Sequence, residues 1–446
     1  MSLGPGLLRR VKGERPLRPA WALAALTGIN LFNYLDRQVL PAVLTPLKEE
    51  LRLSDSALGL LSVAFMLGYF LTAPAFGYLG DRMSRKGLIA AGVLVWSMGT
   101  LLSGWAPNLV SLLLFRIMVG LGEASYGSIS PGWIADLYPP ARRNLRISIF
   151  YMAIPIGSAL GYILGGVMAA HFGWRSAFFW AGAPGLLLAL SLLPLQEPAR
   201  GSSEPESLLP AKGRGQVDAI ADAPRDGNSI NLTPLLSRFF GVYLRLRHHP
   251  DYLLVVAGYV AQTFSMGAFA FWAPTFLSRV HGLGVEQAGR FFGGWLVVTG
   301  LLATFVGGAA ATALGRRSPA GYAQLLALSA LATVPATLAA FILTNRGPAE
   351  AALIAAMFLI FLPTGPINTL ILETVPVGMR ACAMAASIFA IHLLGDFWSP
   401  ALVGFLSDRL GSLREAALCT LPAGTAVCAL LWAWLAARQS RRPPAG

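Results

Sequence analysis

Runs of about 20 or more apolar residues alternate with short polar segments along almost the whole chain. Such a run is long enough to cross the hydrocarbon core of a bilayer as a helix, which satisfies its own backbone hydrogen bonds there. The pattern therefore predicts membrane-spanning helices. We place twelve of them at residues 20–44, 57–79, 87–106, 109–132, 147–170, 177–195, 252–276, 291–314, 320–343, 350–373, 382–406 and 415–436.

Composition and charge support this class. Of the 446 residues, 55% are hydrophobic and 12% are charged, whereas soluble domains carry about 25% charged residues. The net charge of +13 could indicate a nucleic-acid partner, but most of the 34 Lys and Arg fall in segments that alternate with the spans on one side. This is the positive-inside pattern. It predicts two cytoplasmic termini in a plasma (inner) membrane, and it excludes nucleic-acid binding.

The longest polar stretch divides the spans into two sets of six. It covers residues 196–249 and is rich in Pro, Gly, Ser and charge, so most of it is predicted to be a disordered cytoplasmic linker. Residues 234–247 mix apolar and basic positions, which favours an amphipathic helix on the membrane surface over a plain solvated connector. The predicted domains are 1–195, the linker 196–249, and 250–446.

The two sets of spans carry a weak internal repeat. GYLGDRMSRK (77–86) and GAAATALGRR (308–317) both begin with Gly and end with two basic residues. Two related six-helix halves are typical of secondary transporters. The first of these segments resembles the signature loop of the major facilitator superfamily, and LLLFRIMVGLGEAS (112–125) and IPIGSALGYILGG (154–166) resemble two further motifs. The resemblance implies an all-α polytopic protein whose twelve transmembrane helices form two pseudo-symmetric six-helix bundles around a cavity.

Three separated motifs are similar to those of one family within that superfamily. They are NYLDR (33–37), GEASYGSISPGWIADLYPPARR (122–143) and HLLGDFWSP (392–400), and all three resemble the Spinster family. The resemblance implies a bacterial member, expected to be monomeric, that transports lysophospholipids or sphingosine-1-phosphate-like lipids in a proton-linked manner. A drug, a sugar acid or another organic anion remains an alternative substrate.

Charged residues within the first and fourth spans are the candidate functional groups. Asp36 and Arg37 lie in the first span, and Arg116 and Glu123 lie seven residues apart on one face of the fourth. Charges inside a membrane cost a few kcal/mol each and face the bundle interior or a wet cavity. Asp36, Arg37 and Glu123 are therefore predicted to couple protons to transport. The alternative is a static ion pair that joins the two spans.

The predicted substrate contacts combine cations, amides and aromatic rings. Arg37 can pair with the acids or with an anionic headgroup, but not fully with both, and this competition would couple the two ligands. Arg116 could bind a phosphate or only order the contact between the first and fourth spans. The predicted substrate-binding set is Arg37, Arg116, Asn33, Tyr34, Tyr126, Phe269 and Trp272.

Two further groups have candidate roles. The resemblance places Asp81 near the start of the eleventh span, so that a gate closes the cytoplasmic side; its residues are Asp81, Arg82, Arg85 and Lys86. Topology alone would explain the two basic residues at the end. His392 and Asp396 are four residues apart and could touch, as a second titrating pair or as ordinary packing.

The sequence carries no sign of catalysis. It contains no G-x-S-x-G and no H-E-x-x-H motif, and its five His are scattered. The three Cys lie within spans and lack metal-ligand spacing. We therefore expect a protein that is not an enzyme and that uses no cofactor or metal, with protons as the coupling ion. Its expected partners are membrane lipids and an amphiphilic small molecule. A receptor that binds without transporting is not excluded.

Overall fold

The computed structural model describes residues 19–200, 202–203, 245–376 and 379–441. The described part is helical, and its first half consists of α1 (Pro19–Ala42), α2 (Leu44–Leu51), α3 (Asp55–Arg82), α4 (Arg85–Trp105), α5 (Leu109–Leu137), α6 (Pro140–Phe172) and α7 (Trp174–Leu192). The second half consists of α10 (Pro250–His281), α11 (Val285–Gly315), α12 (Gly321–Ile342), α13 (Arg346–Phe361), α14 (Thr364–Glu373), α15 (Arg380–Ala390), η3 (Ile391–Asp396), α16 (Ser399–Leu410) and α17 (Leu413–Ser440).

Each predicted span corresponds to helix in the structure. Eleven helical segments of the described chain are long and apolar enough to cross a membrane. The twelfth is α1, whose hydropathy is lowered by the polar residues of its second half. The predicted surface helix at 234–247 lies mostly outside the described residues, as does most of the linker.

Three features depart from uninterrupted spans. The short helix α2 follows α1 directly, although the sequence pattern predicts only a loop there. The tenth span is broken between α13 and α14 at Leu362 and Pro363, because proline cannot supply the N–H that helix continuation requires. The eleventh span contains a π-helical turn, η3, between α15 and α16. Such turns are rare and occur frequently at functional sites.

Helix ends are set by local chemistry. The side chains of Ser54, Asn108 and Ser412 accept backbone hydrogen bonds at the starts of α3, α5 and α17. Gly411, with φ of 68°, ends α16 in the left-handed conformation that glycine adopts at little cost. These caps fix where the chain turns at the membrane surface.

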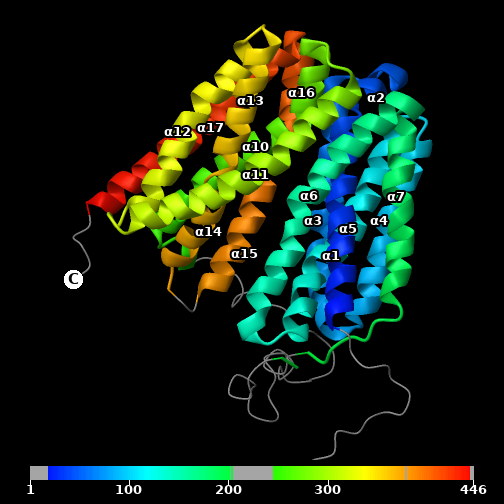
Figure 1. Cartoon of the computed structure of the whole chain (residues 1–446), viewed down its shortest axis with the longest axis horizontal. Helices are drawn as coiled ribbons and strands as arrows, with labels where there is room; N and C mark the ends of the chain where they lie inside the picture. Colours follow the sequence, from blue (N-terminus) through cyan, green and yellow to red (C-terminus); the bar gives the residue numbers. More distant parts are fainter. Residues whose placement is uncertain (1–18, 201, 204–244, 377–378, 442–446) are drawn as a thin grey trace, which may run out of the picture.

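The helices form two bundles, α1–α7 and α10–α17, as Figure 1 shows. We call the end at which α7 stops and α10 starts the linker end, and the opposite end the far end. The bundles meet at the far end and diverge toward the linker end (Figure 1). Among the described residues, the hydrogen bonds and ion pairs that join the two bundles lie in the far half.

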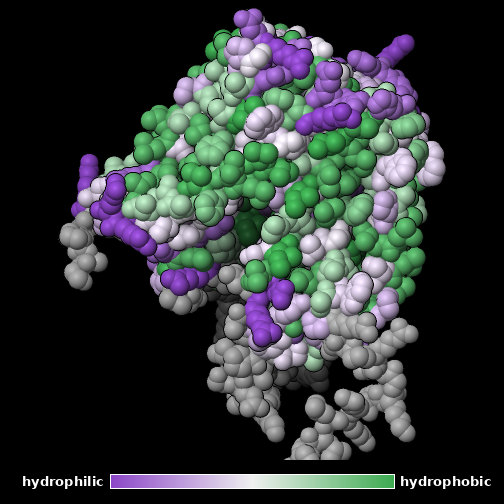
Figure 2. All heavy atoms as spheres, in the orientation of Figure 1, coloured by the Kyte–Doolittle hydropathy of each residue, from purple (hydrophilic) through white to green (hydrophobic). Residues whose placement is uncertain are grey.

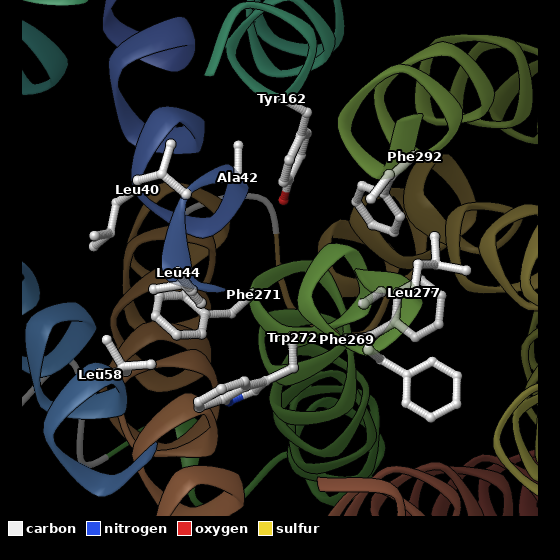
Figure 3. Close-up of a cluster of buried hydrophobic side chains, with 14 of the residues drawn as sticks. Leu40, Ala42, Leu44, Leu58, Tyr162, Phe269, Phe271, Trp272, Leu277 and Phe292 are labelled. Carbon is white, nitrogen blue, oxygen red and sulfur yellow. The ribbon is translucent and has the colours of Figure 1, made fainter. Parts of the chain in front are cut away.

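One apolar core joins the bundles at the far end. Leu44 and Leu58 of the first bundle pack with Phe271 and Trp272 of the second, and all four are buried (Figure 3). The ring of Tyr162 from α6 contacts that of Phe292 from α11, with centroids 4.8 Å apart. The far end is thus sealed by side chains from both bundles.

Glycines let the two bundles approach at backbone distance. A Cβ atom at Gly289 of α11 would lie 2.4 Å from the carbonyl oxygen of Tyr162 on α6. A Cβ atom at Gly404 of α16 would lie 2.2 Å from the carbonyl oxygen of Asp55 on α3. Side chains cannot fit at either position, so these two seams define the closed far end.

Candidate functional site

A cavity of about 250 Å³ lies between the bundles. Figure 2 shows a hollow between them that faces the linker end. Most of the cavity wall comes from α1, α3, α5 and α6, and a smaller part comes from the second bundle. The lining residues are Asn30, Asn33, Tyr34, Arg37, Met66, Tyr69, Glu123, Tyr126, Gly127, Pro131, Phe150, Tyr151, Ile154, Ile388 and His392.

An ion pair stands in the cavity wall. The Nε atom of Arg37 on α1 lies 2.5 Å from Oε2 of Glu123 on α5. The Arg37 side chain is 21% exposed, whereas that of Glu123 is fully buried. The guanidinium group also lies over the rings of Tyr34 and Tyr69, at 5.0 and 5.6 Å from their centroids. The predicted meeting of these two charges is confirmed, and the cation is the partner that a ligand can reach.

Two more buried charges lie close to this pair. The hydroxyl of Thr100 on α4 donates to one carboxylate oxygen of Asp36, and the other oxygen has no partner among the described residues. Nε and Nη1 of Arg116 also lack hydrogen-bond partners there. Arg116 lies over the ring of Phe65, which Arg37 also contacts. Buried polar groups normally have hydrogen-bond partners. The unpaired atoms of Asp36 and Arg116 therefore mark a site that can take a proton, a water molecule or a ligand.

The predicted substrate residues lie in three places. Arg37 lines the cavity together with Asn33, Tyr34 and Tyr126. Arg116 is buried behind the cavity wall.

Phe269 and Trp272 lie elsewhere, in the far-end core, where the indole of Trp272 donates to the carbonyl of Pro400 at 2.9 Å. In this conformation the two rings seal the far end and do not line the cavity.

The second bundle contributes His392 to the cavity wall. Its Nδ1 atom lies 3.0 Å from Oδ2 of Asp396, so the predicted contact between the two side chains is confirmed. The π-helical turn η3 carries both residues. The ring of His392 also contacts that of Phe70 on α3, with centroids 6.5 Å apart. The role of this pair as a second titrating group stays a prediction.

The predicted gate lies at the linker end of α3 and α4. Arg82 stacks on Tyr78, with its guanidinium 4.1 Å from the ring centroid. Nη1 of Arg85 lies 2.5 Å from Oδ2 of Asp136 on α5. The side-chain amine of Lys86 donates to the carbonyls of Leu193 and Leu195, just beyond the end of α7. All these contacts stay within the first bundle. The side chain of Asp81 lies outside the described part of the chain.

A polar network at the far end was not predicted from the sequence. Asp408, near the end of α16, accepts hydrogen bonds from the backbone N–H groups of Asp55 and Ser56 at 2.9 and 2.8 Å. It also accepts one from the Ser56 hydroxyl at 2.5 Å. A carboxylate of the second bundle thus caps the first turn of α3, where the helix dipole favours negative charge.

The carboxylate of Asp55 completes this network. It accepts from Lys48 of α2 and Arg279 of α10, both at 2.7 Å, and from the hydroxyl of Ser407 at 2.6 Å. Asp55 is buried, so its two cationic partners compensate a charge that would otherwise be costly. The sequence gives one sign of this network, the acidic residue Asp55 at the expected start of the second span. An acidic residue there is equally typical of an ordinary helix cap, so it does not predict the network.

We expect Asp408→Ala to weaken closure of the far end. Loss of a helix cap costs about 1 kcal/mol, which is about a fivefold shift in an equilibrium. A cysteine introduced at the buried position Leu58 should therefore react about five times faster with a membrane-impermeant maleimide. Glu350→Ala is the control, because it removes an exposed pair with Arg346 within the second bundle. Equal rates in the two variants would show that the cap does not hold the bundles together.

Comparison with known proteins identifies the class of this protein. Residues 26–400 match the family model of the Major Facilitator Superfamily. A bacterial homologue of the human lysosomal transporter Spinster, in an inward-facing and unoccupied conformation, superposes with a TM-score of 0.77 at 24% identity over 96% of this chain and 99% of that one. A D-xylose–proton symporter superposes with a TM-score of 0.70 at 18% identity, over 96% and 98%. The fold is that of a major facilitator transporter.

Two relatives give the family. The human "Protein spinster homolog 1" is 34% identical over 427 residues, which are 90% of this chain and 76% of the human protein. The Arabidopsis thaliana "Probable sphingolipid transporter spinster homolog 1" is 30% identical over 430 residues, 91% of this chain and 86% of the plant protein. The chain belongs to the Spinster family of major facilitator transporters. The resemblance recognised in the three sequence motifs is thereby confirmed.

Proposed function

We propose that this protein is a proton-coupled secondary transporter that moves an anionic, lysolipid-like amphiphile by alternating access. One observation carries the proposal. Arg37, the cation in the cavity wall, is paired with Glu123, a fully buried carboxylate that can accept a proton. A single group thus stands between two competing partners, the carboxylate and an anionic headgroup.

The competition gives the sign of the coupling. The site holds two acids, Asp36 and Glu123, and two arginines, Arg37 and Arg116. Ionised acids balance the arginines, so the cluster is neutral as a whole. Adding one proton to either acid leaves a net positive charge, and a proton on Glu123 also frees Arg37. Proton binding then favours anion binding, and by linkage anion binding favours proton binding.

The shape of the cavity supports an amphiphile. Its wall combines polar groups from α1 and α5 with apolar surface from Met66, Phe150, Ile154 and Ile388. About 250 Å³ is room for a headgroup. An alkyl tail would extend beyond it, between the bundles. The name of the Arabidopsis relative, a sphingolipid transporter, is in keeping with such a substrate.

The closed far end and open linker end correspond to one of the two states that alternating access requires. With the basic segments on the cytoplasmic side, the open end faces the cytoplasm of a bacterial cell and the sealed end faces outward. The second state would open the α3–α16 and α6–α11 seams and bring the linker end together. The loop with Asp81, Arg82, Arg85 and Lys86 would then serve as the gate, in a protein that works as a monomer.

Uptake into proteoliposomes tests this function. We expect labelled lysophospholipid to accumulate when a pH gradient is imposed and to equilibrate slowly without one. Arg37→Gln should carry at most a tenth of the wild-type flux, because it removes the cation at the cavity wall. Empty liposomes give the background. Folded protein that moves no lysolipid under either condition would contradict the proposal and shift the search to drugs, sugar acids or other organic anions.

A further inference from the structure

The turn between α3 and α4 is held by side chains that come from outside it. Helix ends leave N–H and C=O groups without intrahelical partners. At the start of α4, Glu197 accepts from the backbone N–H of Arg85 at 3.0 Å and of Lys86 at 3.3 Å. It also accepts from the hydroxyl of Ser84 at 3.0 Å. A carboxylate from the beginning of the interdomain linker thus adds a second cap to a transmembrane helix whose N-cap is Ser84.

A second side chain holds the other end of the same turn. Nη2 of Arg200 donates to the carbonyl of Gly80 at 3.0 Å and to that of Met83 at 2.7 Å. Glu197 and Arg200 therefore place negative charge at the start of α4 and positive charge at the end of α3, as the two helix dipoles favour. We call these two side chains the clamp.

Neighbouring residues fasten the clamp to the first bundle. Lys86 donates to the carbonyls of Leu193 and Leu195, both at 3.0 Å. The hydroxyls of Ser202 and Ser203 donate to the carbonyl of Asp136 at 3.0 and 2.6 Å. The start of the linker is therefore tied to the linker ends of α3, α4 and α5 together.

The clamped turn is the one that carries the predicted gate. Asp81 and Arg82 form the end of α3, and Arg85 and Lys86 begin α4. Because the bonds of the clamp stay within one bundle, they can persist while the bundles move. An ordered turn loses less conformational freedom when it docks on the other bundle. Loss of the clamp should therefore disfavour closure of the linker end.

We propose that Glu197 and Arg200 are positioning residues for the gate, so that the first residues of the interdomain linker set the balance between an open and a closed linker end. This inference rests on the proposed alternating access.

Electron-spin distance measurements test it in the full chain reconstituted in lipid. Labels at Leu145→Cys on α6 and Thr312→Cys on α11, with the three native cysteines replaced by alanine, report the separation of the bundles at the linker end. We expect E197Q/R200Q to lower the closed fraction at least threefold. E373Q and R316Q are the controls, because they change an exposed acid and an exposed base at the linker end of the other bundle.

If the clamp only stabilises the fold, a different result is expected. E197Q/R200Q would then have a lower melting temperature but the same closed fraction as the controls, and this outcome would overturn the proposal. Should the double variant fail to fold, E197Q and R200Q alone give the same test with smaller shifts. D81N tests the gate separately from the clamp. A response to D81N without one to the clamp variants leaves the gate in place, whereas a wild-type chain that never closes contradicts alternating access itself.

Discussion

Glu123→Gln is expected to reduce uptake driven by a pH gradient at least tenfold while the protein stays folded. Glutamine keeps the size of the side chain and can accept a hydrogen bond from Arg37, but it neither carries the charge nor takes up a proton. Arg37 is then permanently free for an anion, as in the protonated wild type. Binding of an anionic substrate should be tighter than in the wild type at high pH and should depend less on pH, because Asp36 is then the only acid of the cluster that can still take up a proton.

Folding should tolerate this change. Breaking a buried ion pair costs most when it leaves a charge without water, about 3–5 kcal/mol. Arg37 is the partially exposed member of the pair, so water can solvate it after the substitution. Glu50→Gln is the matched control, because Glu50 pairs with Arg175 at the far end of the same bundle. Uptake of labelled lysophospholipid and binding across a pH series supply the measurements. Normal gradient-driven flux in Glu123→Gln would contradict the proposal that Glu123 couples protons to transport.

Gly289→Val is expected to prevent closure of the far end and to reduce transport to less than a tenth of wild type. A Cβ at this position would stand 2.4 Å from a backbone oxygen of α6, and backbone cannot move aside without parting the helices. The variant should therefore accumulate with its far end open. A cysteine at the buried position Leu44 should become reactive toward a membrane-impermeant maleimide.

The same helix provides the control for this prediction. Gly294 of α11 is exposed, and a Cβ placed there meets nothing within 4 Å. Gly294→Val changes helix propensity by the same amount as Gly289→Val. Any difference in transport between the two variants therefore comes from the α6–α11 seam. Similar transport in the two variants would mean that the α6–α11 contact does not close during the cycle.

The twelve spans could be predicted from the sequence because each apolar run is longer than the hydrocarbon core is thick. Pro363 stands at the break after α13, but proline also lies inside the continuous helices α5 and α6, so its presence alone does not predict a break. The π-helical turn was missed because it depends on the hydrogen-bond register and not on hydropathy. Helix α2 was missed for a similar reason, because a short amphipathic segment has no distinct signal beside a long apolar one. Hydropathy predicts how many times the chain crosses, and says little about where a crossing is interrupted.

The site was predictable where it follows helical periodicity. Arg37 and Glu123 lie on the polar faces of their helices, and they meet. The capping of α3 by Asp408 joins residues 353 positions apart in the chain, and nothing local in the sequence pairs them. Phe269 and Trp272 were expected at the cavity, but a ring on an inward face can line a cavity in one conformation and seal it in another. Periodicity gives the face and cannot give the conformation.

The apolar core at the far end has a consequence for the speed of the transport cycle. Leu58, Phe271 and Trp272 are as buried as residues in the interior of a soluble protein. Under alternating access, this interior is taken apart and rebuilt once for every molecule that crosses. The free energy that holds this core together therefore contributes to the activation barrier of each transport cycle. A substitution that packs this core better would raise the melting temperature and slow the transporter, so natural selection would favour an interior that is only moderately cohesive.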